Sequence, residues 1–205
     1  MKARLFLLSP ASCSGRRADL LLGSSRIALA ERLRSAGGAP IGEVFSFISQ
    51  LYFRGKLTYA RAFASVPSQA PAALGNGLFV ITTSRGLVLP HEPVTLETLR
   101  EFASVDLKIA NHSYVKPLEA CARRIASHLG PDDDVVLLGS IATDKYVEVL
   151  MRVFGERLLF PREFVGRGDM SRGGLMLRCV GEGRELEYQP LMGAIRHGAR
   201  PPRLS

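Results

Sequence analysis

Short apolar segments, each followed by small polar residues, constrain the fold of this chain more than any other feature. They cover residues 4–8, 78–81, 134–138 and 157–160. Apolar runs of four or five residues without alternation are typical of parallel strands that helices cover on both faces. The sequence therefore predicts an α/β fold, with a mostly parallel sheet in a single three-layer domain over residues 1–195.

Segments with apolar residues at helical spacing separate these strands. One begins at Glu43 and runs toward Phe63, with a bend predicted at Gly55. Near the C-terminus, residues 175–180 and 184–188 are joined by Gly-Glu-Gly, which predicts a C-terminal β-hairpin. The other predicted helices cover residues 26–35, residues 96–102 after a Thr95 cap, residues 114–129, and residues 144–154 after a Thr143 cap.

Composition is typical of a globular protein and excludes several other classes. Hydrophobic residues make up 46% of the chain and charged residues 22%, and no apolar run reaches the roughly 18 residues of a membrane helix. The apolar run near the N-terminus is too short for the core of a signal peptide. We therefore expect a cytoplasmic protein with no membrane partner, in which residues 196–205 form a basic flexible tail.

Cysteine and histidine residues show no metal-binding or disulfide pattern. The three cysteines are far apart and include no C-x-x-C pair, and the four histidines lack ligand spacing. The sequence therefore predicts no metal site, no disulfide framework and no cofactor.

Loops rich in Ser, Gly and Arg follow three of the predicted strands, and a similar loop lies near residues 164–174. In open α/β sheets, ligands bind where such loops leave the carboxyl ends of strands. Small side chains expose backbone N–H groups and arginine supplies forked donors, which suits phosphate. The alternative for each loop is an ordinary surface connection with solvated arginines. We predict that the loops line one electropositive pocket formed by Ser9, Ser12, Ser14, Arg16, Arg17, Ser84, Arg85, Gly139, Ser140, Arg167, Gly168 and Arg172.

Asp169, Glu92 and Cys13 are the candidates for chemistry. Asp169 would orient an arginine or accept a hydrogen bond from a ligand hydroxyl, and Glu92 would act with the adjacent histidine as an acid–base pair. Cys13 precedes Arg16 and Arg17, whose charges favour a lowered thiol pKa. The structural alternatives are exposed loop positions for the two carboxylates and packing for the thiol.

Positive charge is concentrated in the first third of the chain. The formal net charge is +8, and residues 1–61 contain ten Lys and Arg but only three Asp and Glu. This asymmetry favours a polyanionic partner, although a coding bias toward arginine is an alternative. Basic residues also alternate with aromatic ones in the predicted helix from Glu43 to Phe63. This pattern fits either a nucleic-acid surface or a packed helix. The basic and aromatic residues are Tyr52, Arg54, Lys56, Tyr59, Arg61 and Phe63.

Several of these segments resemble known families. Leu7–Ala11, Ser84–Pro90 and Gly166–Gly173 resemble, in order, segments of the bacterial peroxide-stress DNA-binding family, although Ser12 stands where that family has a lysine. Cys13–Arg17 is similar to the Cys-Ser-Gly-Lys-Lys segment of small uncharacterised phage and bacterial domains. A related Cys-Ser motif occurs in an accessory domain of the tRNA-modifying enzyme archaeosine synthase. These resemblances imply an association with nucleic acid, with modified bases or with a stress response.

The sequence leaves three functional hypotheses open. The first is a nucleic-acid-associated protein that holds a nucleotide or a backbone phosphate in the predicted pocket. The second is an enzyme that acts on a nucleotide or a modified base by N-glycosidic cleavage or base transfer, with Asp169 or Glu92 as general acid or base. The third is an interaction module of a larger complex.

Overall fold

A computed structural model describes residues 2–67, 69–105, 111–142, 144–196 and 198–199. Its main sheet has six strands in the order β4-β3-β1-β6-β7-β8. The four central strands are parallel, and β4 and β8 pair antiparallel at the two edges. Their bounds are β1 (Arg4–Leu8), β3 (Leu78–Ile81), β4 (Leu87–Val88), β6 (Asp134–Leu138), β7 (Leu158–Pro161) and β8 (Tyr188–Pro190). A separate two-stranded sheet pairs β2 (Ala39–Pro40) with β5 (Pro93–Val94).

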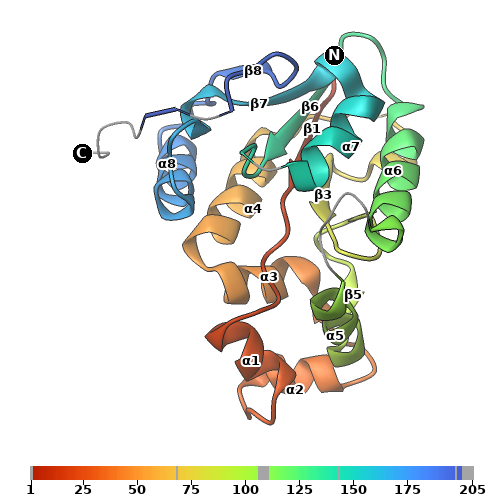
Figure 1. The fold of residues 1–205 in the computed structure, drawn as a ribbon, viewed down its shortest axis with the longest axis vertical. Helices are drawn as coiled ribbons and strands as arrows, with labels where there is room; N and C mark the ends of the chain where they lie inside the picture. The colour runs from red at the N-terminus through yellow and green to blue at the C-terminus, as the bar shows by residue number, and fades with distance from the viewer. Residues whose placement is uncertain (1, 68, 106–110, 143, 197, 200–205) are drawn as a thin grey trace.

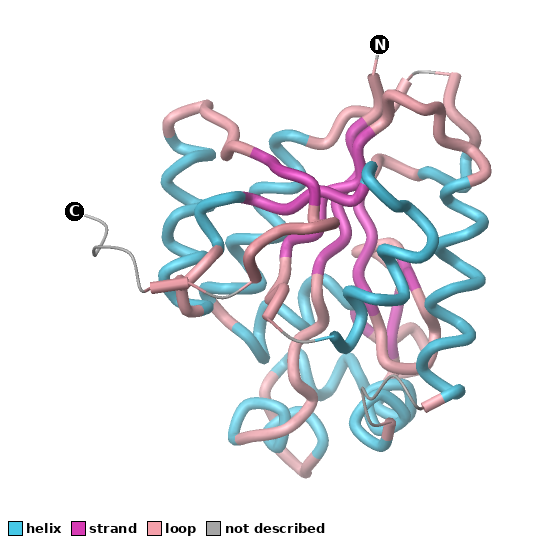
Figure 2. The backbone as a smooth tube through the Cα atoms, turned by 45° about the horizontal axis from the view of Figure 1, so that its top comes forward, coloured by secondary structure: helices cyan, strands magenta, loops and turns pink. Residues whose placement is uncertain are grey.

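Helices cover both faces of the main sheet, as the sequence predicts (Figure 2). One face packs against α4 (Leu51–Phe63) and α8 (Asp169–Gly181), and the other against α6 (His112–Ala126) and α7 (Asp144–Phe154). The remaining helices lie beyond the carboxyl ends of the strands (Figure 1); they are α1 (Arg16–Leu22), α2 (Ala28–Arg34), α3 (Ile41–Ser49) and α5 (Leu96–Ser104). Short 3₁₀ turns cover Ala72–Leu74, Gly155–Arg157 and Arg162–Phe164.

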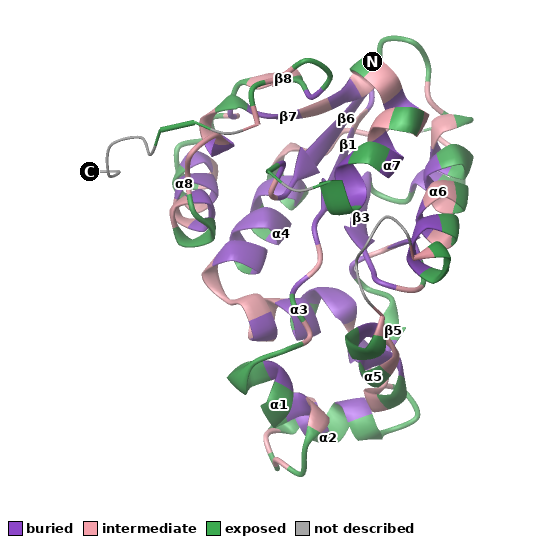
Figure 3. Ribbon diagram, viewed as in Figure 1, coloured by how far each residue is buried: buried purple, intermediate pink, exposed green. Residues whose placement is uncertain are grey.

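The strands are buried on both faces because successive side chains point to opposite sides of the sheet. In β1, Phe6 and Leu8 belong to the core on the α4 side, whereas Leu5 and Leu7 belong to the core on the α6 side. All four side chains are fully buried, and Figure 3 shows the central strands of the sheet as buried. This double burial is why the strands are apolar at every position rather than at alternate ones.

The predicted helix from Glu43 to Phe63 is wrong as one element. Two helices, α3 and α4, meet at Gln50, which adopts a left-handed conformation with φ of 48°. A residue in that conformation cannot continue an α-helix, so the chain turns there rather than at Gly55. Gly55 lies inside α4, where it faces α8.

The prediction of strands at residues 175–180 and 184–188 is also wrong. The first segment belongs to α8, in which Leu175, Met176 and Cys179 are buried at helical spacing against the α4 side of the core. Gly173 and Gly174 lower helix propensity and hide this helix from sequence reasoning. The predicted antiparallel C-terminal pairing is nevertheless present, because β8 pairs with β7 and brings Tyr188 opposite Pro161.

Two other sequence predictions concern the ends of elements. Thr95 caps α5, with its side chain accepting a hydrogen bond from the Thr98 amide, as predicted. Thr143 and, from the predicted tail, residues 197 and 200–205 lie outside the described residues. In the part of the chain that the structure describes, no helix is both long and apolar enough to cross a membrane.

The contact between α4 and α8 depends on two facing glycines. A Cβ atom at Gly55 would lie 2.7 Å from the carbonyl oxygen of Gly173, and a Cβ at Gly173 would lie 2.7 Å from that of Leu51. A side chain at either position therefore forces the two backbones apart. Gly174, the next residue of α8, has no atom within 4 Å of the corresponding position.

We predict that Gly55→Ala lowers the free energy of unfolding by roughly 1–3 kcal/mol, the usual cost of overpacking. Gly174→Ala is the matched control and should raise stability by up to about 1 kcal/mol, because alanine restricts the unfolded chain and favours the helix. Urea denaturation of both variants measures the difference. Equal effects of the two substitutions would show that the helices are not in close contact.

Candidate functional site

The order of the strands reverses at the carboxyl ends of β1 and β6. From β1 the chain first forms β3 on one side, and later forms β6 on the other side of β1. Leu8 pairs with Leu138, and the Ser9 amide donates to the Leu138 carbonyl oxygen at 3.0 Å. Such a reversal of strand order is where open α/β sheets bind their ligands. We refer to the groups gathered there (Ser9, Tyr52, Lys56, Gly139, Ser140, Tyr146, Asp169 and Arg172) as the switch-point cluster.

Gly139 allows the loops after β1 and β6 to come together. A Cβ atom at this position would lie 2.8 Å from Ser9 Cβ and 2.8 Å from the hydroxyl oxygen of Tyr146. Real Cβ contacts are longer, so any other residue would push Ser9 and Tyr146 away. Gly139, which the sequence predicts as a phosphate-binding residue, therefore has a packing role in the structure.

Lys56 of α4 lies in the centre of the cluster and is completely buried. Its Nζ donates to the Ser9 carbonyl oxygen at 2.6 Å and is hydrogen-bonded to Ser9 Oγ at 2.9 Å. The amine also lies 4.3 Å from the centre of the Tyr52 ring and 4.8 Å from that of Phe53. Burial lowers the pKa of Lys56 to about 7; the charge of Asp169 raises this pKa, and that of Arg172 lowers it. A lysine with such a pKa is present in both its protonated and its neutral form near neutral pH.

Tyr146 of α7 continues the chain of polar groups from the other face of the sheet. Its hydroxyl donates to the Ser140 carbonyl oxygen at 2.8 Å and is hydrogen-bonded to the Ser9 side chain. Burial raises the pKa of Tyr146 to about 12, against the effect of the Ser9 hydrogen bond. Ser9 therefore connects Lys56 on one face of the sheet with Tyr146 on the other.

Arg172 and Asp169 occupy the first turns of α8. Arg172 is only 6% exposed, and its guanidinium donates to the Phe164 carbonyl oxygen from Nη2 at 2.9 Å and from Nε at 3.2 Å. Its Nη1 lies 3.4 Å from Asp169 Oδ1, and the Asp169 side chain is 63% exposed. The pair places a buried cation and an exposed carboxylate beside the lysine.

Five of the predicted site residues thus meet at the switch point: Ser9, Gly139, Ser140, Asp169 and Arg172. Arg167 and Gly168 directly precede α8, and Arg167 Nη1 lies 3.4 Å from Ser171 Oγ. The switch-point cluster therefore brings the start of α8 together with the loops after β1 and β6, and Arg167 and Gly168 lie just before it in the chain.

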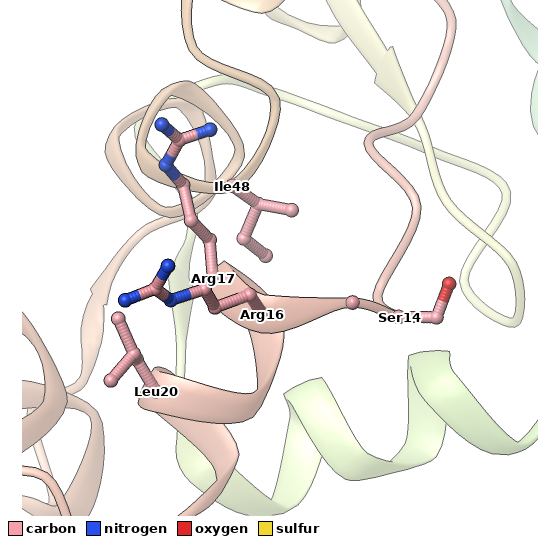
Figure 4. A pocket seen from close by; sticks show the side chains of 6 residues that line it. Ser14, Arg16, Arg17, Leu20 and Ile48 are labelled. Atoms are coloured by element: carbon pink, nitrogen blue, oxygen red, sulfur yellow. The ribbon is translucent and has the colours of Figure 1, made fainter.

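A second group of predicted residues lies apart, around the start of α1 (Figure 4). A surface cavity of about 510 Å³ is lined there by Ser14, Arg16, Arg17 and three neighbours. Ser14 lies away from the two guanidinium groups in Figure 4 and shares a 2.7 Å hydrogen bond with the Ser12 hydroxyl. Burial raises the pKa of Cys13 to about 11, the reverse of the predicted direction, so this thiol stays protonated at neutral pH.

A third group lies where β3 turns back into β4. Arg85 pairs with Glu101 of α5 at 2.8 Å, and Ser84 donates to the same carboxylate. Arg85 and Glu92 line a cavity of about 410 Å³ together with Phe102, and neither this cavity nor the one at α1 includes Arg167. The prediction that Arg16, Arg85 and Arg167 share one pocket is therefore wrong.

The way the elements pack explains why Arg16 and Arg85 lie apart. The extended loop after Ser9 carries α1 beyond the sheet edge, where it packs on α2 and α3, and the tight turn after β3 directs Arg85 toward α5.

Lys56, Tyr52 and Tyr146 are the members of the cluster that sequence reasoning missed. Tyr52, Lys56 and Tyr59 are buried, while Arg54 and Arg61 are exposed, so this segment is a packed helix and not an aromatic nucleic-acid surface. The available signal was helical spacing, because Lys56 follows Phe53 by three residues and precedes Ala60 by four, which places its charge on the apolar face.

The switch-point cluster offers positive charge, hydrogen-bond donors and a proton-exchanging amine. Within the described residues, no group of three or more His, Cys, Asp or Glu side chains is placed to hold a metal ion. No protein-family model, curated protein or solved structure matches the chain. Function is therefore argued below from the geometry of the cluster.

Lys56 predicts an unusual dependence of stability on pH. Its pKa is about 7 in the folded protein, against an ordinary value of 10.5. Between these values the unfolded chain binds more protons, so the free energy of unfolding rises with pH, by up to roughly 1.4 kcal/mol per unit. This stability is lost progressively as the pH falls from 10.5 toward 7, and the slope disappears below about pH 7, where both states are protonated. We expect the slope in urea denaturation between about pH 7 and pH 8.5, below the range in which Cys13 and the buried tyrosines titrate.

Lys56→Met should remove this slope, because methionine fills similar space without a charge. Lys116→Met, which removes an exposed lysine of α6, should keep it. If wild type and Lys56→Met show the same slope over this range, the Lys56 amine titrates normally and the structural account of its burial fails.

Proposed function

We propose that the protein binds a nucleotide or a nucleic-acid phosphate at the carboxyl ends of β1 and β6. The observation that supports this is the pair of buried cations, Lys56 and Arg172, in one small cluster. Burial lowers the pKa of Lys56 and the charge of Arg172 lowers it further, while the carboxylate beside them, Asp169, is mostly exposed. A bound anion would offset the repulsion between the two cations.

The loop from Gly139 to Ala142 is the place for the phosphate. It leads into α7, an 11-residue helix whose first N–H groups have no partner within the helix. Helix N-termini that follow a parallel strand favour anions through these donors and through the helix dipole. Ser140 is partly exposed and Ala142 is exposed, so a ligand has access to the loop.

The exposed arginines of the first third of the chain support a polymeric ligand. Arg16 and Arg17 lie in the cavity at α1, beyond the same edge of the sheet, and Arg54 and Arg61 are exposed on α4. Such separate cationic positions suit successive phosphates of a nucleic acid better than the single phosphate of a free nucleotide. In this proposal Arg16 and Arg17 bind phosphates outside the switch-point cluster.

An enzyme that acts on a nucleotide or a modified base is the second candidate. Its support is Asp169, the exposed carboxylate of the cluster, which is held by Arg172 at 3.4 Å. Glu92 lies in the cavity with Arg85, so Asp169 is the stronger candidate for the general acid or base. Release of free base from nucleosides, followed by chromatography and lost in Asp169→Asn, tests this activity.

A negative charge placed in the phosphate loop tests the binding proposal. We predict that Ala142→Asp weakens binding of adenosine monophosphate and of a single-stranded oligonucleotide by about tenfold or more, which corresponds to about 1.4 kcal/mol of repulsion. Ala120→Asp on the exposed side of α6 adds the same charge elsewhere and should leave both affinities unchanged. Isothermal titration calorimetry and fluorescence anisotropy give the affinities.

Binding of the oligonucleotide should also weaken steeply as salt increases, because phosphate contacts release counterions. A wild-type protein that binds neither probe at low salt would contradict the proposal. So would equal affinities for Ala142→Asp and Ala120→Asp.

A further inference from the structure

Ser9 and Lys56 have the geometry of a nucleophile and its base. Lys56 Nζ lies 2.9 Å from Ser9 Oγ, to which the protonated amine donates, and the same distance lets a neutral amine accept the hydroxyl proton. The two residues are separated by 47 positions in the sequence, and the fold alone brings them together. Ser9 keeps 5% of its surface exposed and Lys56 none.

The surroundings of Lys56 favour a neutral amine that accepts a proton. Both of its hydrogen-bond partners are uncharged atoms of Ser9, and aromatic rings of Tyr52 and Phe53 lie against it. The charged and titratable groups that act on it are Asp169 and Arg172 from α8, with Tyr52 on its own helix. Across the sheet, Tyr146 of α7 reaches the same serine. A desolvated lysine next to a serine hydroxyl is the base of known serine–lysine pairs.

We propose that Ser9 is a nucleophile activated by Lys56, and that the pair transfers or hydrolyses an acyl group. This activity goes beyond the phosphate binding proposed above and does not depend on it. An acyl carbon is the electrophile that fits, because its attack by serine needs a base and hydrogen-bond donors.

The reaction balances with the groups present and water. Ser9 Oγ attacks the acyl carbon, and its proton moves to the neutral amine of Lys56. The tetrahedral adduct collapses, the bond to the leaving group breaks, and Lys56 returns the proton to the leaving group. Water then attacks the acyl-serine, giving one proton to Lys56, and the acid leaves as Ser9 Oγ recovers that proton. Tyr146 is a positioning residue, since its hydroxyl contacts Ser9 and the Ser140 carbonyl oxygen.

A purely structural lysine would hold the Ser9 carbonyl oxygen at the end of β1 without activating the hydroxyl. Reaction with a fluorophosphonate distinguishes the two roles, because this probe phosphonylates activated serines and releases fluoride. We expect one adduct per chain on Ser9, located by peptide mass spectrometry. The exposed Ser12 and Ser14 in the same loop should stay unmodified, because among the described residues their hydroxyls bond to each other and to no basic side chain.

Variants and a pH profile complete the test. Lys56→Met should lower the labelling rate roughly 100-fold or more, the usual contribution of a general base, while Lys116→Met and Ser127→Ala should label like wild type. The wild-type rate should rise with pH to a plateau, with a midpoint near the Lys56 pKa of about 7. The pH profile is measured on the wild-type protein alone, so it tests the proposal even if a variant at position 56 does not fold.

Absence of an adduct on wild-type Ser9 would overturn the proposal. A rate that does not change with pH between about 5.5 and 8.5 would also overturn it, as would equal labelling of a folded Lys56→Met protein. Phosphate binding is measured separately with Ala142→Asp, so either proposal can fail while the other stands.

Discussion

The contact between Lys56 and Ser9 unites the parts of this structure that lie far apart in sequence. It places a fully buried amine of α4 against the residue that ends the first strand, at the point where strand order reverses. Burying a lysine without a hydrogen-bonded carboxylate costs stability, which appears here as a pKa lowered to about 7. Such costs are tolerated mainly where a function depends on the group. The cluster around Ser9 is therefore the part of the molecule in which function is most strongly indicated.

Glycine contacts support that cluster from both sides of the sheet. Gly55 and Gly173 let α8 approach α4 closely, and this approach brings Arg172 and Asp169 to the lysine. On the other side, Gly139 lets Tyr146 and Ser9 meet. These glycines do not adopt a left-handed conformation. Glycine is required at each position because backbone atoms or a hydroxyl occupy the space that a side chain would need. Their role is to fix distances between the polar groups.

The positive charge of the chain is divided between two kinds of place. Lys56 and Arg172 are buried at the switch point, whereas Arg16 and Arg17 lie in an open cavity on α1. Buried cations act over short range in a medium of low polarity, and exposed ones act through long-range attraction that salt screens. In the functions that we propose, proton transfer and anion binding therefore belong to the first group, and attraction of a polyanion to the second.

The sequence alone determined the strands β1, β3, β6 and β7, because double burial makes every residue of a strand apolar, and it determined that polar loops follow them. It also named Ser9, Gly139, Ser140, Asp169 and Arg172 as candidate site residues, and these five meet at the switch point. Only the tertiary structure decided that Arg85 turns away to Glu101, that residues 175–180 form a helix, and that Lys56 reaches Ser9. Local patterns report burial and periodicity, but the partner of a buried charge depends on which elements pack together. A lysine on an apolar helix face shows that a partner is needed, and the fold supplies that partner from 47 residues away.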